Sequence, residues 1–304
     1  MNKVHVSNYL NHGIKGHAKY EFVDVVVNDD NRLFIDPILI ETGQNQNKWC
    51  IEANDIIQSF FKIFYKAYEQ RDKTTKTEIL AHAREQNGTR LGYGNGHNGK
   101  GNTAHGLLCV FKPLEQLILD IKTMKKPEDL PVLIPGFAED GLSDMLTNIL
   151  HEHLNQFTLQ QLSKYGIQNN SSIQFWTWNR LTECWKEVKR DCYCVEGHEV
   201  LLVPKNIVRK GYLFKTHQYF SRIILERMRE EGYYSRDGKL MPKKEIVSAK
   251  RNSAPHWEYD ETISYTVQHN DALEEYHKKL PNFYADNGHA MNDSELDSFL
   301  YMCM

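Results

Sequence analysis

The stretch spanning residues 130–167 constrains the fold most, because it carries the signals of a strand, a turn and a long helix in succession. Leu130–Pro135 is short and apolar, which predicts a buried strand. From Gly141 to Tyr165 apolar residues recur at helical spacing, and Gly166 follows as a C-terminal stop. The sequence therefore predicts a strand–turn–helix unit, with a break in the helix near residues 157–158, around which the other elements are arranged.

Strand and helix signals elsewhere are mixed along the chain and do not alternate regularly. β-Branched and aromatic runs predict strands, and apolar residues three and four apart predict helices. The predicted strands are 19–28, 32–40, 172–178, 192–195 and 199–204, the first two and the last two forming hairpins; the predicted helices are 52–70, 77–85, 107–124 and 213–231. This mixture predicts an α+β (mixed α/β) fold. A mixed sheet with hairpins flanked by helices would occupy residues 1–210, and a mainly helical portion with an acidic tail would occupy residues 211–304.

Composition and cysteine usage favour a cytoplasmic protein. Hydrophobic residues make up 40% and charged residues 25% of the 304-residue chain, as in an ordinary soluble protein. No apolar run approaches the ~20 residues that span a bilayer, and the N-terminus lacks the apolar centre of a signal peptide. The six cysteines are dispersed, which is typical of a chain kept reduced. We therefore expect a cytoplasmic location and no membrane partner.

Charge is distributed unevenly between two neighbouring sections. Residues 186–251 contain 16 Lys and Arg against 9 Asp and Glu, and residues 252–304 contain 2 against 10. The basic section predicts an anionic partner such as nucleic acid. The acidic tail could pair with that surface, and its final apolar residues 299–301 could bind a partner protein or a second copy. The alternative is that both sections are simply solvated faces.

Carboxylates and polar groups line one side of the helix predicted after residue 140. Asp140, Asp144, Asn148 and His151 recur at spacings of four and three, opposite an apolar face. A metal-binding or water-orienting role is one interpretation of this polar row. The other is that Asp140 caps the helix and Asp144 is a solvated acid of the first turn.

Asp36 adds a further carboxylate at the predicted end of a strand, because Pro37 cannot donate to a strand ladder. A strand end fixes the position of a side chain, which suits a catalytic carboxylate; an edge strand with the acid facing water is the alternative. We predict Mg²⁺ or Mn²⁺ held by Asp36, Asp140 and Asp144, with Glu41 or Glu85 as a possible fourth ligand.

Basic residues near a glycine-rich segment are the predicted phosphate contacts. Residues 87–106 contain seven glycines in twenty residues, which predicts a loop whose backbone amides suit an anion, although no standard phosphate-binding fingerprint is present. A flexible surface loop or a lid are the alternatives. The predicted phosphate or substrate contacts are Lys100, Arg90 and His97 of this loop, with Lys205, Arg209 and Lys210 further along.

The segment from Glu199 to Lys205 resembles, at the level of a motif only, the strand that carries Glu-x-Lys in nucleases of the restriction-endonuclease type. It departs from that motif because the two residues lie six apart and Pro204 intervenes. Cys192 and Cys194, with His198 and Cys184 nearby, form the best candidate for zinc. Their spacing lacks the paired CxxC of structural sites, so we expect no zinc.

These observations together predict a divalent-metal-dependent nuclease or phosphodiesterase of prokaryotic type that acts on nucleic acid. Asp36, Asp140, Asp144 and Lys205 would be its catalytic residues. A phage-defence or toxin-like effector is the suggested setting. One alternative is a non-catalytic nucleic-acid- or protein-binding subunit of a multi-protein defence complex, and a second is a small-molecule nucleotide phosphohydrolase.

Overall fold

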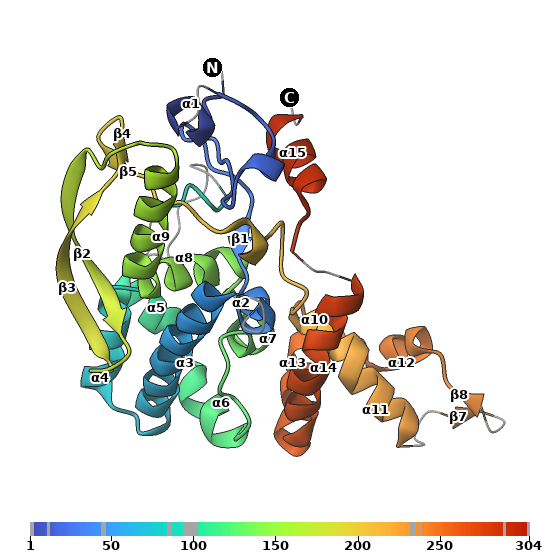
Figure 1. Cartoon of the computed structure of the whole chain (residues 1–304). Helices are drawn as coiled ribbons and strands as arrows, with labels where there is room; N and C mark the ends of the chain where they lie inside the picture. Colours follow the sequence, from blue (N-terminus) through green and yellow to red (C-terminus); the bar gives the residue numbers. More distant parts are fainter. Residues whose placement is uncertain are drawn as a thin grey trace.

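The structure, a computed structural model, describes residues 3–10, 13–43, 47–83, 87–93, 103–231, 235–236, 239–287 and 290–302. It confirms the α+β class, with small antiparallel sheets set among many helices (Figure 1). The strands of the described residues pair two by two: β1 (Phe34–Ile35) with β6 (Val208–Arg209), β2 (Ser171–Asn179) with β3 (Cys184–Cys192), β4 (Cys194–Val195) with β5 (His198–Glu199), and β7 (Ser235–Arg236) with β8 (Lys239–Leu240).

The helices of the described residues fall into two groups along the chain, one before β2 and one after β6. The first group is α1 (Val6–Leu10), α2 (Pro37–Gly43), α3 (Lys48–Glu69), α4 (Lys73–Ala81), α5 (Ala104–Val110), α6 (Leu114–Asp120), α7 (Asp129–Leu133), α8 (Glu139–Ile149) and α9 (His151–Lys164). The second group is α10 (Thr216–Tyr219), which continues through a π-helical turn (Phe220–Ile224) into α11 (Leu225–Glu230), then α12 (Lys243–Lys250), α13 (Trp257–Gln268), α14 (Asp271–Asn287) and α15 (Asp293–Tyr301). None of these described helices is both long and apolar enough to cross a membrane.

The long helix α3 anchors the core, as its apolar stripe predicts. Asn47 begins it, because its side chain accepts a hydrogen bond from the Trp49 amide. One side then buries a continuous set of aromatic rings, of which Phe60, Phe61 and Phe64 are fully buried. Burial of this apolar area is the main force that holds the neighbouring helices around α3.

The unit predicted from residues 130–167 is wrong in its first part and confirmed in its second. Residues 129–133 form the helix α7 and no strand: the amides of Asp129 and Leu130 donate to the carbonyls of Lys126 and Pro127 and so turn the chain into a helix. A short apolar run has the same pattern in a buried helix as in a buried strand. The predicted helix divides into α8 and α9 at Leu150, seven residues before the expected break, and ends before Gly166 at φ +69°.

The hairpin predicted from residues 19–28 and 32–40 does not form. The first segment is extended but bonds elsewhere: the Val23 amide donates to Val203 and the Val25 carbonyl accepts from Val6. The second contributes only β1, which pairs with β6, and then turns into α2. Its predicted end near Asp36 is confirmed. The two predicted strands therefore use partners that are distant in sequence.

The later hairpins agree better with the sequence. The predicted strand at residues 172–178 is β2, and the ambiguous residues after it form β3, with Trp176 opposite Glu187 and Trp178 opposite Trp185. The predicted hairpin of residues 192–204 is present in a shorter form: β4 and β5 are each two residues long, and the turn lies at residues 196–197, one residue before the expected turn.

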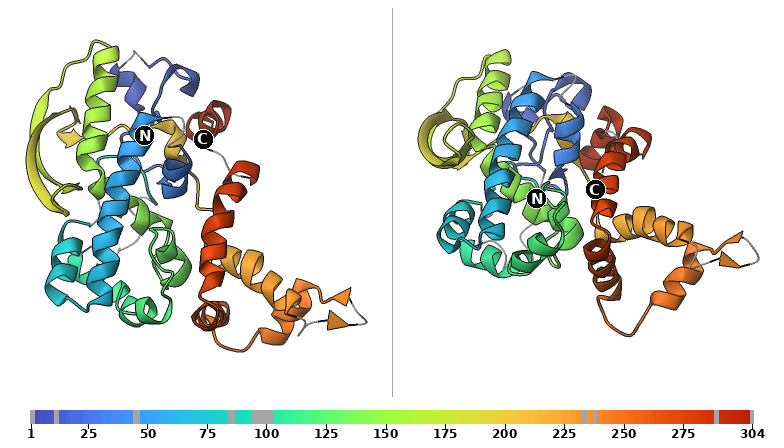
Figure 2. Two further views of the ribbon diagram at one scale, coloured as in Figure 1. Left: turned by 60° about the horizontal axis from the view of Figure 1, so that its bottom comes forward. Right: turned by 90° about the horizontal axis from the view of Figure 1, so that it is seen from below.

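The helical C-terminal region extends from α10 to α15, and α12 with β7 and β8 stands away from the body (Figure 2). Its acidic residues pair with several cations of the basic section. The pairs are Arg227 with Asp271, Lys250 with Glu261 at 3.0 Å, and Lys205 with Asp293 at 2.5 Å. Part of the basic section is therefore neutralised within the chain.

Candidate functional site

Asp36, the first predicted metal ligand, is fully buried and bonded within the fold. One carboxylate oxygen accepts the Ile38 amide at 2.9 Å and so caps α2, and the other accepts the Tyr284 hydroxyl at 2.6 Å. Burial raises the pKa of this carboxyl to about 6, although the bonds from Tyr284 and Ile38 and the nearby Arg209 guanidinium act to lower it. Asp36 therefore joins α2 to the C-terminal helix α14.

The acids at the start of α8 gather around Tyr212 together with Asp36. Burial, followed by the surrounding carboxylates, raises the pKa of the Tyr212 hydroxyl well above its usual value. These carboxylates are Asp36, Glu139, Asp144 and Asp140. Glu139, which no sequence pattern distinguishes, is buried and accepts hydrogen bonds from Lys215 at 2.8 Å and from the Tyr93 hydroxyl at 3.0 Å.

The backbone at Gly92 lies close to one of these acids, Asp140. This glycine has φ +133°, and a Cβ placed on it would lie 2.9 Å from the Asp140 carboxylate, so a larger residue would push the two segments apart. Within α8, the Asn148 side chain donates to the Asp144 carbonyl at 3.0 Å. The predicted polar row is thus partly used for contacts inside the fold.

No three His, Cys, Asp or Glu side chains of the described residues are grouped so that they could hold a metal ion. Glu41, a proposed fourth ligand, instead accepts Lys126 at 2.8 and 3.0 Å, and Glu85 lies outside the described residues. Cys192 and Cys194 approach to 3.7 Å between their sulfurs. Metal-dependent hydrolysis stays a prediction.

The predicted phosphate contacts are dispersed. Lys205 is bound by Asp293 at 2.5 Å and by the His17 carbonyl at 2.8 Å. The Arg209 guanidinium lies over the Tyr284 ring at 5.5 Å, and the Lys210 amine over the Phe299 ring at 4.5 Å. The Arg90 backbone is left-handed, at φ +56°, and its carbonyl accepts from Asn31. Lys100 and His97, with the centre of the glycine-rich segment, lie outside the described residues.

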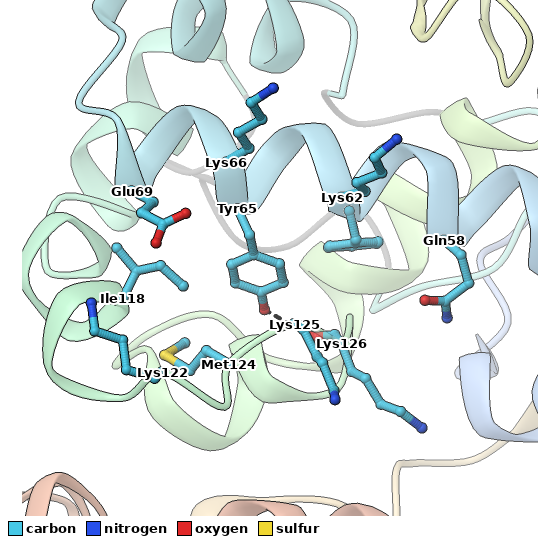
Figure 3. Close-up of a pocket in the computed structure, with 11 residues that line it drawn as sticks. Gln58, Lys62, Tyr65, Lys66, Glu69, Ile118, Lys122, Met124, Lys125 and Lys126 are labelled. Atoms are coloured by element: carbon cyan, nitrogen blue, oxygen red, sulfur yellow. Dashed lines mark hydrogen bonds between the residues drawn. The ribbon is translucent and has the colours of Figure 1, made fainter. Parts of the chain in front are cut away.

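A cavity of about 490 Å³ lies elsewhere, between α3 and the chain that follows α6 (Figure 3). We call it the lysine pocket, because five of its eleven lining residues are lysines: Lys62, Lys66, Lys122, Lys125 and Lys126. Phe61, Tyr65, Ile118 and Met124 close its floor, and Gln58 and Glu69 complete its rim. No local sequence pattern marks this group, since its members come from two segments about sixty residues apart.

Local structure explains how the lysines come together. Lys62 and Lys66 are one turn apart on α3, and Tyr65 between them donates its hydroxyl to the Lys126 carbonyl at 2.8 Å. That bond ties the second segment to α3. Lys62 also pairs with Glu183 at 2.7 Å, whereas no ion pair of Lys66, Lys122 or Lys125 is present in the described part of the chain.

Lys126 connects the pocket to a buried cluster of charges. Its amine pairs with Glu41 and lies 3.5 Å from Glu128, and Asp129 lies 2.5 Å from the His277 ring of α14. Burial raises the pKa of Glu128 to about 7, against the opposing charges of Lys126 and His277. Burial acts to lower the pKa of His277, but the charge and hydrogen bond of Asp129 raise it above its usual value. Such clustered shifts are typical of functional sites as well as of structural networks.

Comparison with known proteins gives a family and no relative of known activity. A family model described as "Domain of unknown function (DUF8370)" matches residues 13–214. No curated protein and no solved structure matches the chain. The matched residues include all five lysines of the pocket, and they end before α14 and His277.

Proposed function

Because the chain belongs to the DUF8370 family, whose description assigns no activity, we propose a function from its geometry: the protein binds nucleic acid through the lysine pocket. The observation that carries this proposal is that five lysines and one glutamate are among the eleven residues lining one cavity of about 490 Å³. Phosphate groups are the anions that such a surface would neutralise in a nucleic acid.

Charge around the pocket supports an anionic ligand. Residues 58–69 and 118–126, which include every residue that lines it, together contain five Lys and no Arg against two Asp and Glu. Lys62 and Lys66 lie at positions i and i+4 of α3, where like charges repel by a few tenths of a kcal/mol. An anion between or beside them would remove this repulsion.

The spread of the amines favours an extended anion over a single phosphate. Figure 3 shows the amines of Lys62 and Lys66 on one side of α3 and those of Lys125 and Lys126 on the other, with Tyr65 between them. A compact phosphate would contact only part of this set. A chain of phosphodiesters could contact successive lysines, as in the basic grooves that follow single strands.

The rigid floor would keep these flexible side chains in place. Phe61, Ile118 and Met124 are buried, and Tyr65 is held by its bond to Lys126. Their packing fixes the two backbone segments, and therefore the stems of the lysines. Binding would then require ordering only the ends of the lysine side chains.

Fluorescence anisotropy with a labelled single-stranded oligonucleotide tests the proposal. The probe should have about 20 nucleotides, longer than the ~4–16 that one binding surface covers. If three to five phosphates are neutralised, log K should fall against log salt with a slope of about −2 to −3.5. Replacing Lys66, Lys122 and Lys125 by Gln should weaken binding at least about tenfold and make the slope shallower by about 2.

A matched variant in the basic section provides the control. Lys186, Lys189 and Lys244 are also exposed, so their replacement by Gln removes the same charge at the site predicted from the sequence. We expect this control to bind within about twofold of the wild type, once the small loss of affinity caused by the lower net positive charge is allowed for. Full binding by the pocket variant, with loss in the control, would overturn the proposal and place nucleic acid on the basic section.

The same preparation can test the other predictions. Excess nucleoside triphosphate that displaces the oligonucleotide at equal phosphate concentration would contradict an extended ligand. Incubation of the oligonucleotide with Mg²⁺, Mn²⁺ or EDTA tests the hydrolysis predicted from the sequence, with Asp144→Asn as the inactive control. Cleavage that persists in this variant would exclude Asp144 from the reaction.

A further inference from the structure

One buried carboxylate, that of Asp129, holds the backbone of two lysines of the pocket. Asp129 has no solvent exposure, and its Oδ2 atom accepts the backbone amides of Lys125 and Lys126, both at 2.9 Å. Charge-assisted bonds of this kind are among the stronger ones in proteins. The direction of the chain at these lysines therefore depends on where Asp129 is held.

Asp129 is held in turn by the C-terminal helical region. Its Oδ1 atom lies 2.5 Å from Nε2 of His277, a buried residue of α14. The pair joins residues 148 positions apart and lies across the end of the family match. Within the described residues, the other ring nitrogen of His277 has no hydrogen-bond partner, so Asp129 is the bonded contact of this side chain.

Glu128 belongs to the same buried cluster of charges, in which the carboxylates outnumber the cationic side chains. Three carboxylates, Glu41, Glu128 and Asp129, face Lys126 and His277. Glu128 is 1% exposed, and its Oε1 atom accepts no hydrogen bond from the described residues while the Lys126 amine lies 3.5 Å away. A buried carboxylate in this position favours uptake of a proton.

We infer that His277 is a positioning residue of the lysine pocket, which acts through Asp129 on Lys125 and Lys126, and that protonation of the buried cluster strengthens anion binding. The inference rests on the proposed function of the pocket for its binding part. According to this inference, a residue of α14, which lies outside the family match, controls a site that lies within the match. The positioning part can be measured without any ligand.

The sign of the pH effect follows from the groups around Glu128. These are Lys126, His277, Asp129 and Glu41, with the neutral hydroxyls of Tyr65 and Tyr276. As pH falls from 8 to 6 it passes the raised pKa of Glu128, about 7, and this carboxyl loses its negative charge, while the raised pKa of His277 favours the charged form of its ring, so the wall of the pocket becomes more positive. An anion should bind more tightly at pH 6, and by linkage it should draw protons into the cluster.

Binding measured at pH 6, 7 and 8 and constant ionic strength tests the linkage. We expect the wild type to bind the oligonucleotide about three- to tenfold more tightly at pH 6 than at pH 8. Glu128→Gln keeps the shape of the side chain without its charge, and should bind at pH 8 about as the wild type does at pH 6. His269→Gln, which removes a histidine outside the cluster, is the matched control and should keep the wild-type profile. An unchanged profile in Glu128→Gln would contradict the linkage.

Substitutions at His277 separate positioning from charge. Gln at this position retains an N–H group that can reach Asp129 but does not titrate, whereas Leu loses the donor. Hydrogen exchange of the Lys125 and Lys126 amides should accelerate at least about tenfold in His277→Leu and stay near the wild-type rate in His277→Gln. The thermal melting curves of both variants show whether either loses the fold as a whole.

The outcomes distinguish this inference from the proposed function. Faster exchange in His277→Leu with no oligonucleotide binding by the wild type would retain the positioning role and contradict the nucleic-acid function. Binding by the wild type with exchange rates and pH profiles unchanged in all three cluster variants would overturn the inference alone. A His277→Leu protein that melts early leaves the test to His277→Gln and Glu128→Gln, whose pH profiles must flatten.

Discussion

The carboxylates around Tyr212 and the lysine pocket use charge in opposite ways. Asp36 and Glu139 are buried, and each is bonded to a partner on another segment: Tyr284 for the first and Lys215 for the second. Lys66, Lys122 and Lys125 are exposed and close to other cations. The first region was prominent in the sequence, whereas the second was found only in the structure.

The difference indicates which charges the fold itself needs. A buried carboxylate must be hydrogen-bonded, since an unpartnered one costs several kcal/mol, so its bonds explain its presence without any ligand. Exposed lysines side by side gain nothing from the fold and lose a little by repulsion. Residues that fold stability does not explain are the better candidates for binding.

Removal of the Asp36 carboxylate should give the largest effect on stability. Asp36→Ala uncaps α2 and leaves the buried Tyr284 hydroxyl without its acceptor. Loss of a cap costs ~1 kcal/mol and an orphaned buried group ~1–3 kcal/mol, so we expect the free energy of unfolding to fall by about 3 kcal/mol. Urea denaturation at pH 7 measures it. A loss below about 0.5 kcal/mol would show that the fold does not depend on this carboxylate.

The pH dependence of the free energy of unfolding should reveal the ionisation of the Asp36 carboxyl. The pKa of Asp36 is about 6 when folded against 3.8 as its usual value, so the folded state binds the extra proton between these values. This residue then contributes less stability as pH rises from about 4 to 6, by on the order of 2–3 kcal/mol. Asp36→Asn keeps the cap and cannot titrate, so the gap between variant and wild type should narrow or reverse from pH 4 to pH 7. A constant gap across that range would contradict the raised pKa.

Much of the fold could be predicted where the signal was local. The aromatic stripe of α3, the β2 run and the glycine of the β4–β5 hairpin each predict their element from neighbouring residues. Predictions failed where the partner was distant: the strand β1 pairs with β6, and the apolar residues of α7 form a short helix that packs against α10 and α13. Pairing over such distances depends on the whole core and leaves no local pattern.

The same reason explains the site residues that the sequence did not reveal. Lys62 and Lys126 belong to segments that read separately as ordinary polar helix and turn residues. Asp129 and His277 lie 148 residues apart. A signal that could have been used is the excess of Lys and Arg in residues 58–76 and 112–126, because each segment also has an apolar face that must pack against something.

Lys205 is a predicted phosphate contact whose amine is already bonded within the fold, so its substitution tests that prediction. Its amine bonds Asp293 of α15 and the His17 carbonyl, so Lys205→Ala should loosen α15. Partly exposed pairs of this kind contribute about 0.5–1 kcal/mol. Limited proteolysis should cut near α15 faster in this variant than in Lys244→Ala, whereas both should bind the oligonucleotide within about twofold of wild type. A large loss of binding in Lys205→Ala alone would restore it as a phosphate contact.

Lys66 should give the smallest effect on stability and a clear effect on binding, which is the sharpest form of the comparison with Asp36. Lys66→Gln keeps a good helix former on an exposed face of α3. It removes a repulsion with Lys62 at i−4 and an attraction to Glu69 at i+3, and these are similar in size, so the free energy of unfolding should change by less than about 0.5 kcal/mol. Affinity for the oligonucleotide should nevertheless fall about threefold, and the salt slope should become shallower by about 0.7, because one phosphate contact is lost. Denaturation and anisotropy on the same preparation measure both. A variant that loses stability and binding together would place Lys66 with Asp36 among the charges that hold the fold, and would remove the distinction between the two regions.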